Sequence, residues 1–364
     1  MINEIDFMKN LHKYWKYWVY VLECKKLAKG WEFMAKTTIY DVAGAAKVSL
    51  ATVSRVMNNP EKVNKETRDK VLRVIKELGY KPNAIARGLA SRKSTTVGII
   101  VSDISRAAVS QLLGGILDIA KKYEYAAKLF TMDENADIKE VMRQVVAEQV
   151  DGILFLNDEL DNEQMEMVMN HIQDAQIPVV LCNVIYDEKD IPSVAIDYEK
   201  ATYDMTKELI EKGKKKIYLA STVHRYSTNY HKVRGYERAM QDAGLEPLVF
   251  RTSGDVSVNT LHFDEFIKNN EIEAVIAVRD SIAVSFINTA IRLGYKVPDN
   301  FIVVGLQNTK YAILSRPTLT CVDTPVYDIG AVSMRLLTKL MAGEEVNDSR
   351  IVLPYHIVER ESTK

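Results

Sequence analysis

The sequence predicts an α/β protein in which an N-terminal, all-α helix-turn-helix headpiece precedes two subdomains, each a doubly wound parallel sheet. Three observations predict this architecture. Two short helical patterns joined by a tight turn lie within residues 38–58, and short apolar runs alternate with helical patterns from residue 97 onward. The 364 residues are enough for two or three compact units.

The first helical pattern begins at a capping signal. Thr38 and Asp41 have the spacing of a capping box, which predicts a helix from Ile39. Ser49 can cap a second helix. The inward residues of that second helix are expected to be Val53, Val56 and Met57.

The second helix carries the candidate base-reading residues. In a helix-turn-helix, the N-terminal residues of the second helix face the bases. We therefore expect Leu50, Ala51 and Arg55 to reach base edges, and the forked guanidinium of Arg55 suits guanine. The residues expected to hold phosphates or to cap helices are Thr38, Tyr40, Ser49, Thr52, Ser54 and Asn58. An ordinary small helical hairpin is the alternative interpretation of this segment.

A third helix and a short tether are predicted next. Asn64 can cap the helix, and Gly79 stands where a left-handed residue ends it. In the segment 84–91, Gly88 weakens helix formation by about 1 kcal/mol relative to alanine. A helix this short is marginal in water, so it would need a partner helix and DNA to hold it.

The charge is distributed unevenly along the chain. Residues 37–93 contain twelve lysines and arginines and five aspartates and glutamates, an excess of seven positive charges. Since the whole chain has a net charge of −1, the remainder must carry eight net negative charges. A basic module on an acidic body indicates a polyanion bound at one end, with salt-sensitive affinity.

The rest of the chain predicts two parallel sheets. The strand candidates are 97–101, 127–130, 152–156, 179–182, 194–196, 216–220, 275–278 and 301–304. Their near-continuous apolar character is typical of parallel strands buried on both faces. Ligands bind beyond the C-terminal ends of such strands. The polar residues at those ends are Ser102, Asp103, Asn157, Asn183, Asp197, Arg279, Asp280, Gln307 and Asn308. Turn and capping roles are the alternative for each of them.

Residues 38–96 resemble the headpiece and hinge of the LacI/GalR family of bacterial repressors, down to Pro82-Asn83-Ala84 and Arg87-Gly88-Leu89-Ala90-Ser91. The resemblance implies a homodimer that binds a double-stranded operator, a periplasmic-binding-protein-like core, and neither a cofactor nor a metal. It also implies that paired hinge helices lie over the minor groove and that Leu89 enters the central base step, as apolar wedges do in kinked duplexes. Asn83 belongs to the same predicted DNA-binding set.

The resemblance also sets the expected domain boundaries. An atypical leader covers 1–33, the headpiece 34–82, the hinge helix and linker 83–96, and the core 97–364. Within the core, the first subdomain is expected at 97–194 and 323–352. The second subdomain is expected at 195–322 and 353–364.

An effector cleft is implied between these subdomains. The residues expected there are Ser102, Asp103, Asp197, Lys232, Arg234, Asp280 and Gln307. Sugar-responsive relatives bind ligand hydroxyls with an aspartate at the position of Asp280. This sequence departs from them, because Ser105-Arg106-Ala107-Ala108 replaces an Asn-Pro-Phe-Phe-like segment, Lys232 an arginine, and Gln307 an aspartate. Without an aromatic shelf and a bidentate guanidinium, recognition of hydroxyls should weaken, so a small sugar or nucleotide effector is the alternative hypothesis.

A second control surface is predicted over residues 327–341. Asp328, Val332, Arg335 and Lys339 share one helix face, and the two cations repel each other unless an anion such as a phosphate lies between them. A solvated helix face is the alternative. The run resembles the carbon catabolite regulators of the family, whose corepressor is the phosphocarrier protein HPr phosphorylated on a serine. The matching positions are Tyr327, Asp328, Val332, Arg335, Leu336, Thr338 and Lys339.

Two further positions depart from the family pattern. In Gly115-Ile116-Leu117-Asp118-Ile119, Leu117 stands where an aspartate is common, so a carboxylate that could pair with a basic residue of the partner is missing. Lys47 replaces the Gly or Asn usual in the helix-turn-helix bend. The bend must therefore tolerate a strained backbone or change its shape.

The remaining features favour a cytoplasmic protein. Cys182 and Cys321 lie in apolar runs, no Cys/His cluster has the spacing of a metal site, and no apolar run approaches the roughly 20 residues of a membrane span. Residues 1–33 crowd aromatic residues beside lysines. They are interpreted as a poorly ordered leader from an upstream start, and a membrane-surface or partner-binding helix is the alternative.

Two other protein classes are disfavoured. A solute-binding protein would need a signal peptide, and neither it nor a Rossmann-type enzyme explains the basic N-terminal module. For an enzyme there is also no glycine-rich phosphate loop, because Gly114-Gly115 lies inside a helical pattern. The sequence is therefore interpreted as a transcription regulator and not as an enzyme.

Overall fold

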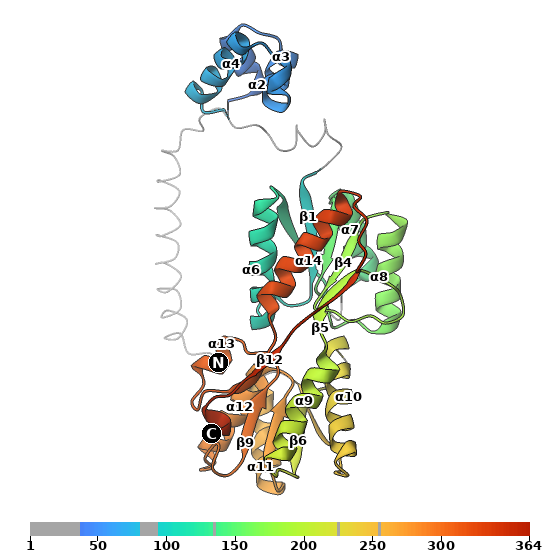
Figure 1. The fold of residues 1–364 in the computed structure, drawn as a ribbon, viewed down its shortest axis with the longest axis vertical. Helices are drawn as coiled ribbons and strands as arrows, with labels where there is room; N and C mark the ends of the chain where they lie inside the picture. The colour runs from blue at the N-terminus through green and yellow to red at the C-terminus, as the bar shows by residue number, and fades with distance from the viewer. Residues whose placement is uncertain (1–36, 81–93, 134–135, 224–225, 254–255) are drawn as a thin grey trace, which may run out of the picture. The chain divides into compact units, whose positions relative to one another are not determined.

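The computed structural model describes residues 37–80, 94–133, 136–223, 226–253 and 256–364 (Figure 1). The chain divides into two compact units, Met1–Arg87 and Gly88–Lys364, and each is described by itself. The predicted leader, the hinge helix, Asn83 and Leu89 lie outside the described residues.

The first unit contains the predicted helix-turn-helix. Its elements are α2 (Ile39–Ala46), α3 (Leu50–Asn58), the 3-10 turn η1 (Pro60–Lys62) and α4 (Lys65–Glu77). Both expected caps are present: Thr38 N donates to Asp41 Oδ2 at 2.7 Å, and Thr52 N donates to Ser49 Oγ at 3.1 Å. One core holds the three helices together, and it consists of Val42, Ala43, Ala46, Val53, Val56 and Val71.

The bend between α2 and α3 keeps its tight form with a lysine in it. Lys47 has φ 51° and ψ 46°, which is the left-handed region. Its N–H donates to Gly44 O at 3.2 Å, and Val48 N donates to Ala43 O at 3.1 Å. The bend therefore tolerates a strained backbone and does not change shape, which was one of the two expected outcomes.

The first subdomain of the second unit is built on a six-stranded sheet in the order β11-β5-β4-β3-β1-β2, with all pairs parallel. The strands are β1 (Thr96–Val101), β2 (Ala126–Thr131), β3 (Gly152–Phe155), β4 (Val179–Cys182), β5 (Ser193–Ile196) and β11 (Arg350–Leu353). The helices of this layer are α6 (Ala107–Lys122), α7 (Ile138–Ala147), α8 (Asn162–Asp174) and α14 (Val326–Met341). Every residue of β3 is buried, as a parallel strand covered on both faces requires.

The second subdomain repeats this plan with the strand order β12-β10-β9-β8-β6-β7. Its strands are β6 (Ile217–Thr222), β7 (Leu248–Thr252), β8 (Ala274–Ala277), β9 (Ile302–Gly305), β10 (Thr320–Asp323) and β12 (His356–Val358), of which β12 runs antiparallel to β10. Its helical elements are α9 (Tyr198–Glu211), α10 (Ser227–Asp242), α11 (Val256–Asn269), α12 (Asp280–Arg292), α13 (Lys310–Leu314) and the 3-10 turn η2 (Glu361–Thr363). The chain crosses between the two sheets after β5, β10 and β11.

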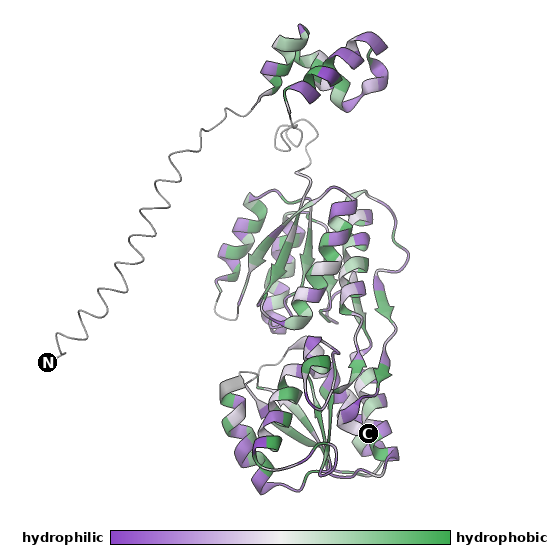
Figure 2. Ribbon diagram, turned by 90° about the vertical axis from the view of Figure 1, so that its left-hand side faces the viewer, coloured by the Kyte–Doolittle hydropathy of each residue, from purple (hydrophilic) through white to green (hydrophobic). Residues whose placement is uncertain are grey.

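The predicted fold class is confirmed. Four strands were missed: β10 lies inside its sheet but has polar residues at both ends, Thr320 and Asp323, and the other three share a physical reason. Figure 2 shows hydrophobic strands at the centre of each sheet and hydrophilic outer faces on the helices. The strands β7, β11 and β12 lie at sheet edges and carry Arg251, Arg350 and His356. Edge strands need no continuous apolar run, so a search for such runs passes over them.

Two glycines let α6 and α14 touch backbone to backbone. A Cβ at Gly115 would overlap the carbonyl oxygen of Tyr327, and a Cβ at Gly330 would overlap that of Leu112. A side chain at either position would force the helices apart. These glycines therefore allow the close distance at which α6 and α14 cross (Figure 1).

Candidate functional site

The exposed face of α3 carries the predicted base-reading residues. Leu50, Ala51 and Arg55 are exposed, whereas Val53 and Val56 are buried against the other two helices. Arg55 forms no ion pair with any described residue of the chain. An unpaired guanidinium on this face is available for the acceptors of a guanine.

The other polar residues of α3 are tied to one another. Thr52 lies within 2.9 Å of Ser49 through their hydroxyl oxygens, and Asn58 Nδ2 donates to Ser54 Oγ at 3.3 Å. The Ser49–Thr52 contact fits the capping role that was one of the two expectations, and it lies at the N-terminal turn of α3. The Asn58–Ser54 contact links two side chains one turn apart at the C-terminal end of the same helix.

The start of α2 is arranged in the same way. Thr38 Oγ1 donates to Asp41 Oδ2 at 2.8 Å, in addition to the backbone bond. These bonds lower the pKa of Asp41, so the cap stays charged at neutral pH. Tyr40 makes no such contact among the described residues, and most of its surface is exposed.

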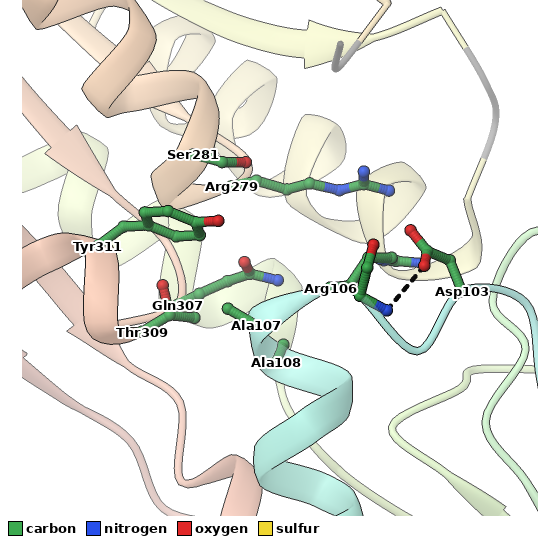
Figure 3. A pocket seen from close by; sticks show the side chains of 10 residues that line it. Asp103, Arg106, Ala107, Ala108, Arg279, Ser281, Gln307, Thr309 and Tyr311 are labelled. Atoms are coloured by element: carbon green, nitrogen blue, oxygen red, sulfur yellow. Dashed lines mark hydrogen bonds between the residues drawn. The ribbon is translucent and has the colours of Figure 1, made fainter. Parts of the chain in front are cut away.

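A cavity of about 210 Å³ opens between the two subdomains of the core. It is lined by Asp103, Ser105, Arg106, Ala107, Ala108, Arg279, Ser281, Gln307, Thr309 and Tyr311. Figure 3 shows Arg279 and Gln307 extending from the second subdomain toward the loop of Asp103 and Arg106 in the first. The helices α6 and α12 both begin at this cavity, so their positive dipole ends add to the two guanidiniums. The cavity is thus suited to an anionic group.

The two arginines of the cavity differ in their pairing. Arg106 Nη1 lies 2.9 Å from Asp158 Oδ1 and 3.0 Å from Glu159 Oε1. Burial alone would raise the pKa of Asp158, but the charge and hydrogen bond of Arg106, together with the charges of Arg279 and Lys232, outweigh it, so the pKa lies below its usual value. Arg279 stacks on the Tyr226 ring at 4.4 Å, and its buried Nη2 has no hydrogen-bond partner among the described residues. Arg279 is therefore the cation of the cavity that lacks an acceptor.

Two of the predicted cleft residues are enclosed in the second subdomain and do not line the cavity. Asp280 is fully buried and accepts hydrogen bonds from Thr309 N and Thr309 Oγ1 at 2.5 and 2.9 Å. Lys232 is 1% exposed and donates to Val278 O at 3.0 Å. Burial, with the nearby charge of Arg279, lowers the pKa of Lys232 to about 7. Both side chains hold internal backbone groups in place.

Of the other predicted cleft residues, some line the cavity and the rest form contacts outside its lining. Asp197 caps α9 by accepting from Lys200 N at 2.8 Å, and Arg234 lies 3.3 Å from Glu199 on the surface. Ser102 accepts from Arg106 Nη1 at 3.5 Å. Of the residues predicted for the cleft, Asp103 and Gln307 line the cavity directly.

The exposed face of α14 bears two unpaired cations. Arg335 and Lys339 are one helical turn apart, are both exposed, and form no ion pair with any residue that the structure describes. Asp328 is exposed as well, and Tyr327 Oη donates to Asp118 Oδ2 of α6 at 2.6 Å. The face therefore combines two cations with an aromatic ring and carboxylates.

The remaining predicted residues of α14 differ in exposure. Val332 is partly buried, and Leu336 and Thr338 point into the core. Thr338 Oγ1 donates to Arg335 O at 2.7 Å. Leu117, on the neighbouring α6, is exposed. A protein that docks here would meet Tyr327, Val332 and the two cations, while Leu336 and Thr338 support the helix from below.

Other kinds of site are not evident in the described part of the chain. No helix there is both long and apolar enough to span a membrane. Within the same ranges, no three His, Cys, Asp or Glu side chains converge in a way that could hold a metal ion. Cys182 and Cys321 are buried, and burial raises the pKa of both thiols, so neither is a reactive thiolate.

Comparison with known proteins assigns the family. Residues 38–83 match the bacterial regulatory proteins of the lacI family, and residues 206–363 match the periplasmic binding protein-like domain. Catabolite control protein A of Priestia megaterium is 41% identical over 333 residues, which cover 90% of this chain and 99% of that protein. The solved transcription regulator CcpA of Lactococcus lactis is 33% identical, with a TM-score of 0.68 over 74% of this chain and 99% of that one. The transcriptional regulator CelR in complex with cellobiose is 26% identical, with a TM-score of 0.67 over 90% of this chain and 99% of that one. The chain belongs to the LacI family of DNA-binding transcription regulators, which are not enzymes, and within that family it is similar to the catabolite control proteins.

Proposed function

We propose that this regulator binds a near-palindromic operator as a homodimer in the cytoplasm, and that a serine-phosphorylated HPr protein docks on α14 and raises its affinity for DNA. The observation that carries the proposal is the pair of unpaired cations, Arg335 and Lys339, on the exposed face of α14 in a chain 41% identical to a catabolite control protein. Regulation of carbon catabolism follows from the same similarity. The decisive experiment removes this pair and is set out in the Discussion.

The DNA-binding half of the proposal uses the exposed face of α3. Two copies of Leu50, Ala51 and Arg55 would enter successive major grooves, which gives an operator with inverted half-sites. The residues proposed to hold DNA phosphates or to cap the helices are Thr38, Tyr40, Ser49, Thr52, Ser54 and Asn58, and Asn83 belongs to the same DNA-binding set. Leu89 is proposed as the wedge at the central base step.

The corepressor half uses the charge of a phosphate. The cations of Arg335 and Lys339 repel each other in the free protein, because they stand one turn apart with no carboxylate between them. A phosphoserine carries a charge of about −1.5 to −2 at neutral pH and turns this repulsion into attraction. The residues proposed to contact the corepressor are Tyr327, Asp328, Val332, Arg335 and Lys339. Leu336 and Thr338, which the sequence also placed in this set, are buried and would support the helix from beneath.

An exposed apolar face on α13 supports the homodimer. Ile313 and Leu314 are 60% and 71% exposed in a helix of five residues, and Tyr311 is exposed beside them. A soluble monomer rarely leaves large apolar neighbours uncovered, so a second copy of the chain is the proposed cover.

Glutamate at both Ile313 and Leu314 should dissociate the dimer. Each lost side chain removes about 1.5–3 kcal/mol of burial on each protomer, so dimerisation should weaken by more than about 100-fold. Sedimentation velocity measures the change, and operator affinity should fall with it. Leu261→Glu is the matched control, because Leu261 is 74% exposed on α11 and should leave the dimer intact. A double variant that stays dimeric would exclude α13 as the dimer surface.

The cavity supports a second function, which is control by a small anionic effector. Of the positions predicted for the cleft (Ser102, Asp103, Asp197, Lys232, Arg234, Asp280 and Gln307), Asp103 and Gln307 line the cavity. The observation that favours an anion is the buried Nη2 of Arg279, which has no hydrogen-bond partner among the described residues. A solved relative binds cellobiose, a neutral sugar. The polar lining of this chain instead favours a sugar phosphate or a nucleotide.

Calorimetry with sugars, sugar phosphates and purines tests this second function. We expect binding of the phosphorylated compounds only, and we expect Arg279→Gln to weaken it by at least about 10-fold, since a lost charge-assisted hydrogen bond costs about 1.5–3 kcal/mol. Equal binding of a neutral sugar, or binding unaffected by Arg279→Gln, would contradict the assignment of Arg279.

A further inference from the structure

The bend between α2 and α3 places a lysine where glycine is the unstrained residue. Lys47 has φ 51° and ψ 46°, a conformation that is unfavourable for any residue with a Cβ. Gly79, after α4, has φ 59° and shows the unstrained solution at another helix end of the same unit. The lysine therefore keeps a conformational cost that glycine would remove.

The side chain of Lys47 is not used within the headpiece. It is exposed, and it forms no ion pair with any residue in the described part of the chain. The nearest acidic residue in the sequence, Asp41, is engaged by the backbone and hydroxyl of Thr38. A structural role for the Lys47 ammonium is therefore absent among the described contacts.

The position of the bend directs this charge toward the DNA backbone. In a helix-turn-helix the second helix enters the major groove and the first crosses the phosphate backbone, so the turn between them lies at the edge of the groove. Lys47 stands two residues before Ser49, the N-cap of α3. The flexible four-carbon side chain of Lys47 can place its ammonium group beyond the backbone of the bend. A single point charge of this kind suits a phosphate better than the donors and acceptors on the edge of a base.

We propose that Lys47 binds an operator phosphate from the helix-turn-helix bend, and that this contact outweighs the strain of its left-handed backbone. The inference deepens the DNA-binding function and rests on it. Phosphate contacts of this kind fix the register of the recognition helix without reading sequence. Lys47 is accordingly a positioning residue for Leu50 and Arg55.

The test compares three variants of the full chain on two duplexes. Lys47→Gly removes both the charge and the strain, Lys47→Gln removes the charge alone, and Lys47→Arg keeps the charge. One duplex is selected by the wild-type protein from a random-sequence pool, and the other is an unselected duplex of equal length. Affinity is measured over a series of salt concentrations, and thermal unfolding of the headpiece is followed for each variant.

We expect Lys47→Gly and Lys47→Gln to bind both duplexes about 10- to 100-fold more weakly near 0.1 M salt, because each phosphate contact contributes about −0.9 to the salt slope and a dimer has two copies. The slope should become shallower by about two in both variants. Lys47→Arg should bind like the wild type. The unfolding temperature should stay unchanged in Lys47→Gln and stay unchanged or rise in Lys47→Gly, because glycine relieves the left-handed backbone.

Gln149→Gly is the matched control for strain. Gln149 also has φ 51° and is exposed, but it lies after α7 in the core. Its replacement should relieve the same strain and leave DNA binding unchanged.

Three outcomes overturn the proposal: unchanged affinity in Lys47→Gln, weakened binding together with a lower unfolding temperature, or weakened binding of the selected duplex alone at an unchanged slope. The last would identify a base contact. If the wild type selects no duplex at all, the operator function fails separately, and the unselected duplex still tests the phosphate contact.

Discussion

Replacing Arg55 with alanine is expected to abolish preference for the operator while leaving general affinity for DNA largely intact. Arg55 is exposed on α3 and has no ion-pair partner in the described residues, so its five donors are available to a guanine. One bidentate contact discriminates by about 1–3 kcal/mol, and a dimer loses two of them. Affinity for the selected duplex should fall by roughly 30-fold or more, measured by fluorescence anisotropy at fixed salt.

The unselected duplex and a second arginine provide the controls for Arg55. Arg73 is exposed on α4, outside the recognition helix, and Arg73→Ala removes the same charge from the same unit. It should weaken both duplexes slightly and equally. If Arg55→Ala also weakens both duplexes equally, Arg55 contacts a phosphate, and the base-reading face of α3 must be sought at Leu50 and Ala51.

Removing Arg335 and Lys339 together should abolish stimulation of DNA binding by serine-phosphorylated HPr. Each cation is expected to make a charge-assisted contact of about 1.5–3 kcal/mol with the phosphate, so the loss exceeds the coupling that a corepressor normally supplies. The variant Arg335→Ala with Lys339→Ala should bind its operator with the affinity of the unstimulated wild type. Titration of operator binding with the phosphorylated partner measures this directly.

Exchanging the two cations separates charge from shape. The variant Arg335→Lys with Lys339→Arg keeps both positive charges and should retain most of the stimulation. Unphosphorylated HPr should stimulate neither the wild type nor any variant. Stimulation that survives the double alanine change would show that the phosphoprotein docks elsewhere, without affecting the assignment of the headpiece.

The local signals of the sequence predicted the headpiece well. The caps at Thr38 and Ser49 depend on residues three positions away, and such short-range hydrogen bonds can be predicted directly from spacing. Eight of the twelve described strands were also predictable, because buried parallel strands are mostly apolar. The edge strands β7, β11 and β12 carry charged or titratable residues, and β10 has polar residues at both ends, so none of these four gave such a signal.

The cavity could be predicted only in outline. Nine polar residues that follow predicted strands were candidates for a ligand site, and three of them, Asp103, Arg279 and Gln307, line the cavity. Asp280 and Arg279 are adjacent residues after β8, but only Arg279 lines the cavity. The side chain of Asp280 is buried and accepts hydrogen bonds from Thr309, which is 29 positions away in the sequence. The pairing of Arg106 with Asp158 spans 52 positions. No periodicity or spacing encodes contacts of that range, because each joins loops that follow different strands of one sheet.

The glycine contact between α6 and α14 lies between the two proposed effector sites of this protein. Ala107 and Ala108, at the start of α6, line the cavity, and α14 bears Arg335 and Lys339. At Gly115 and Gly330 the backbones of α6 and α14 are in direct contact. Because the contact is close-packed, a tilt of one helix should displace the other. A small anion in the cavity and a phosphoprotein docked on α14 would therefore act on the same pair of helices. Each ligand would change the affinity of the protein for the other ligand by the same factor.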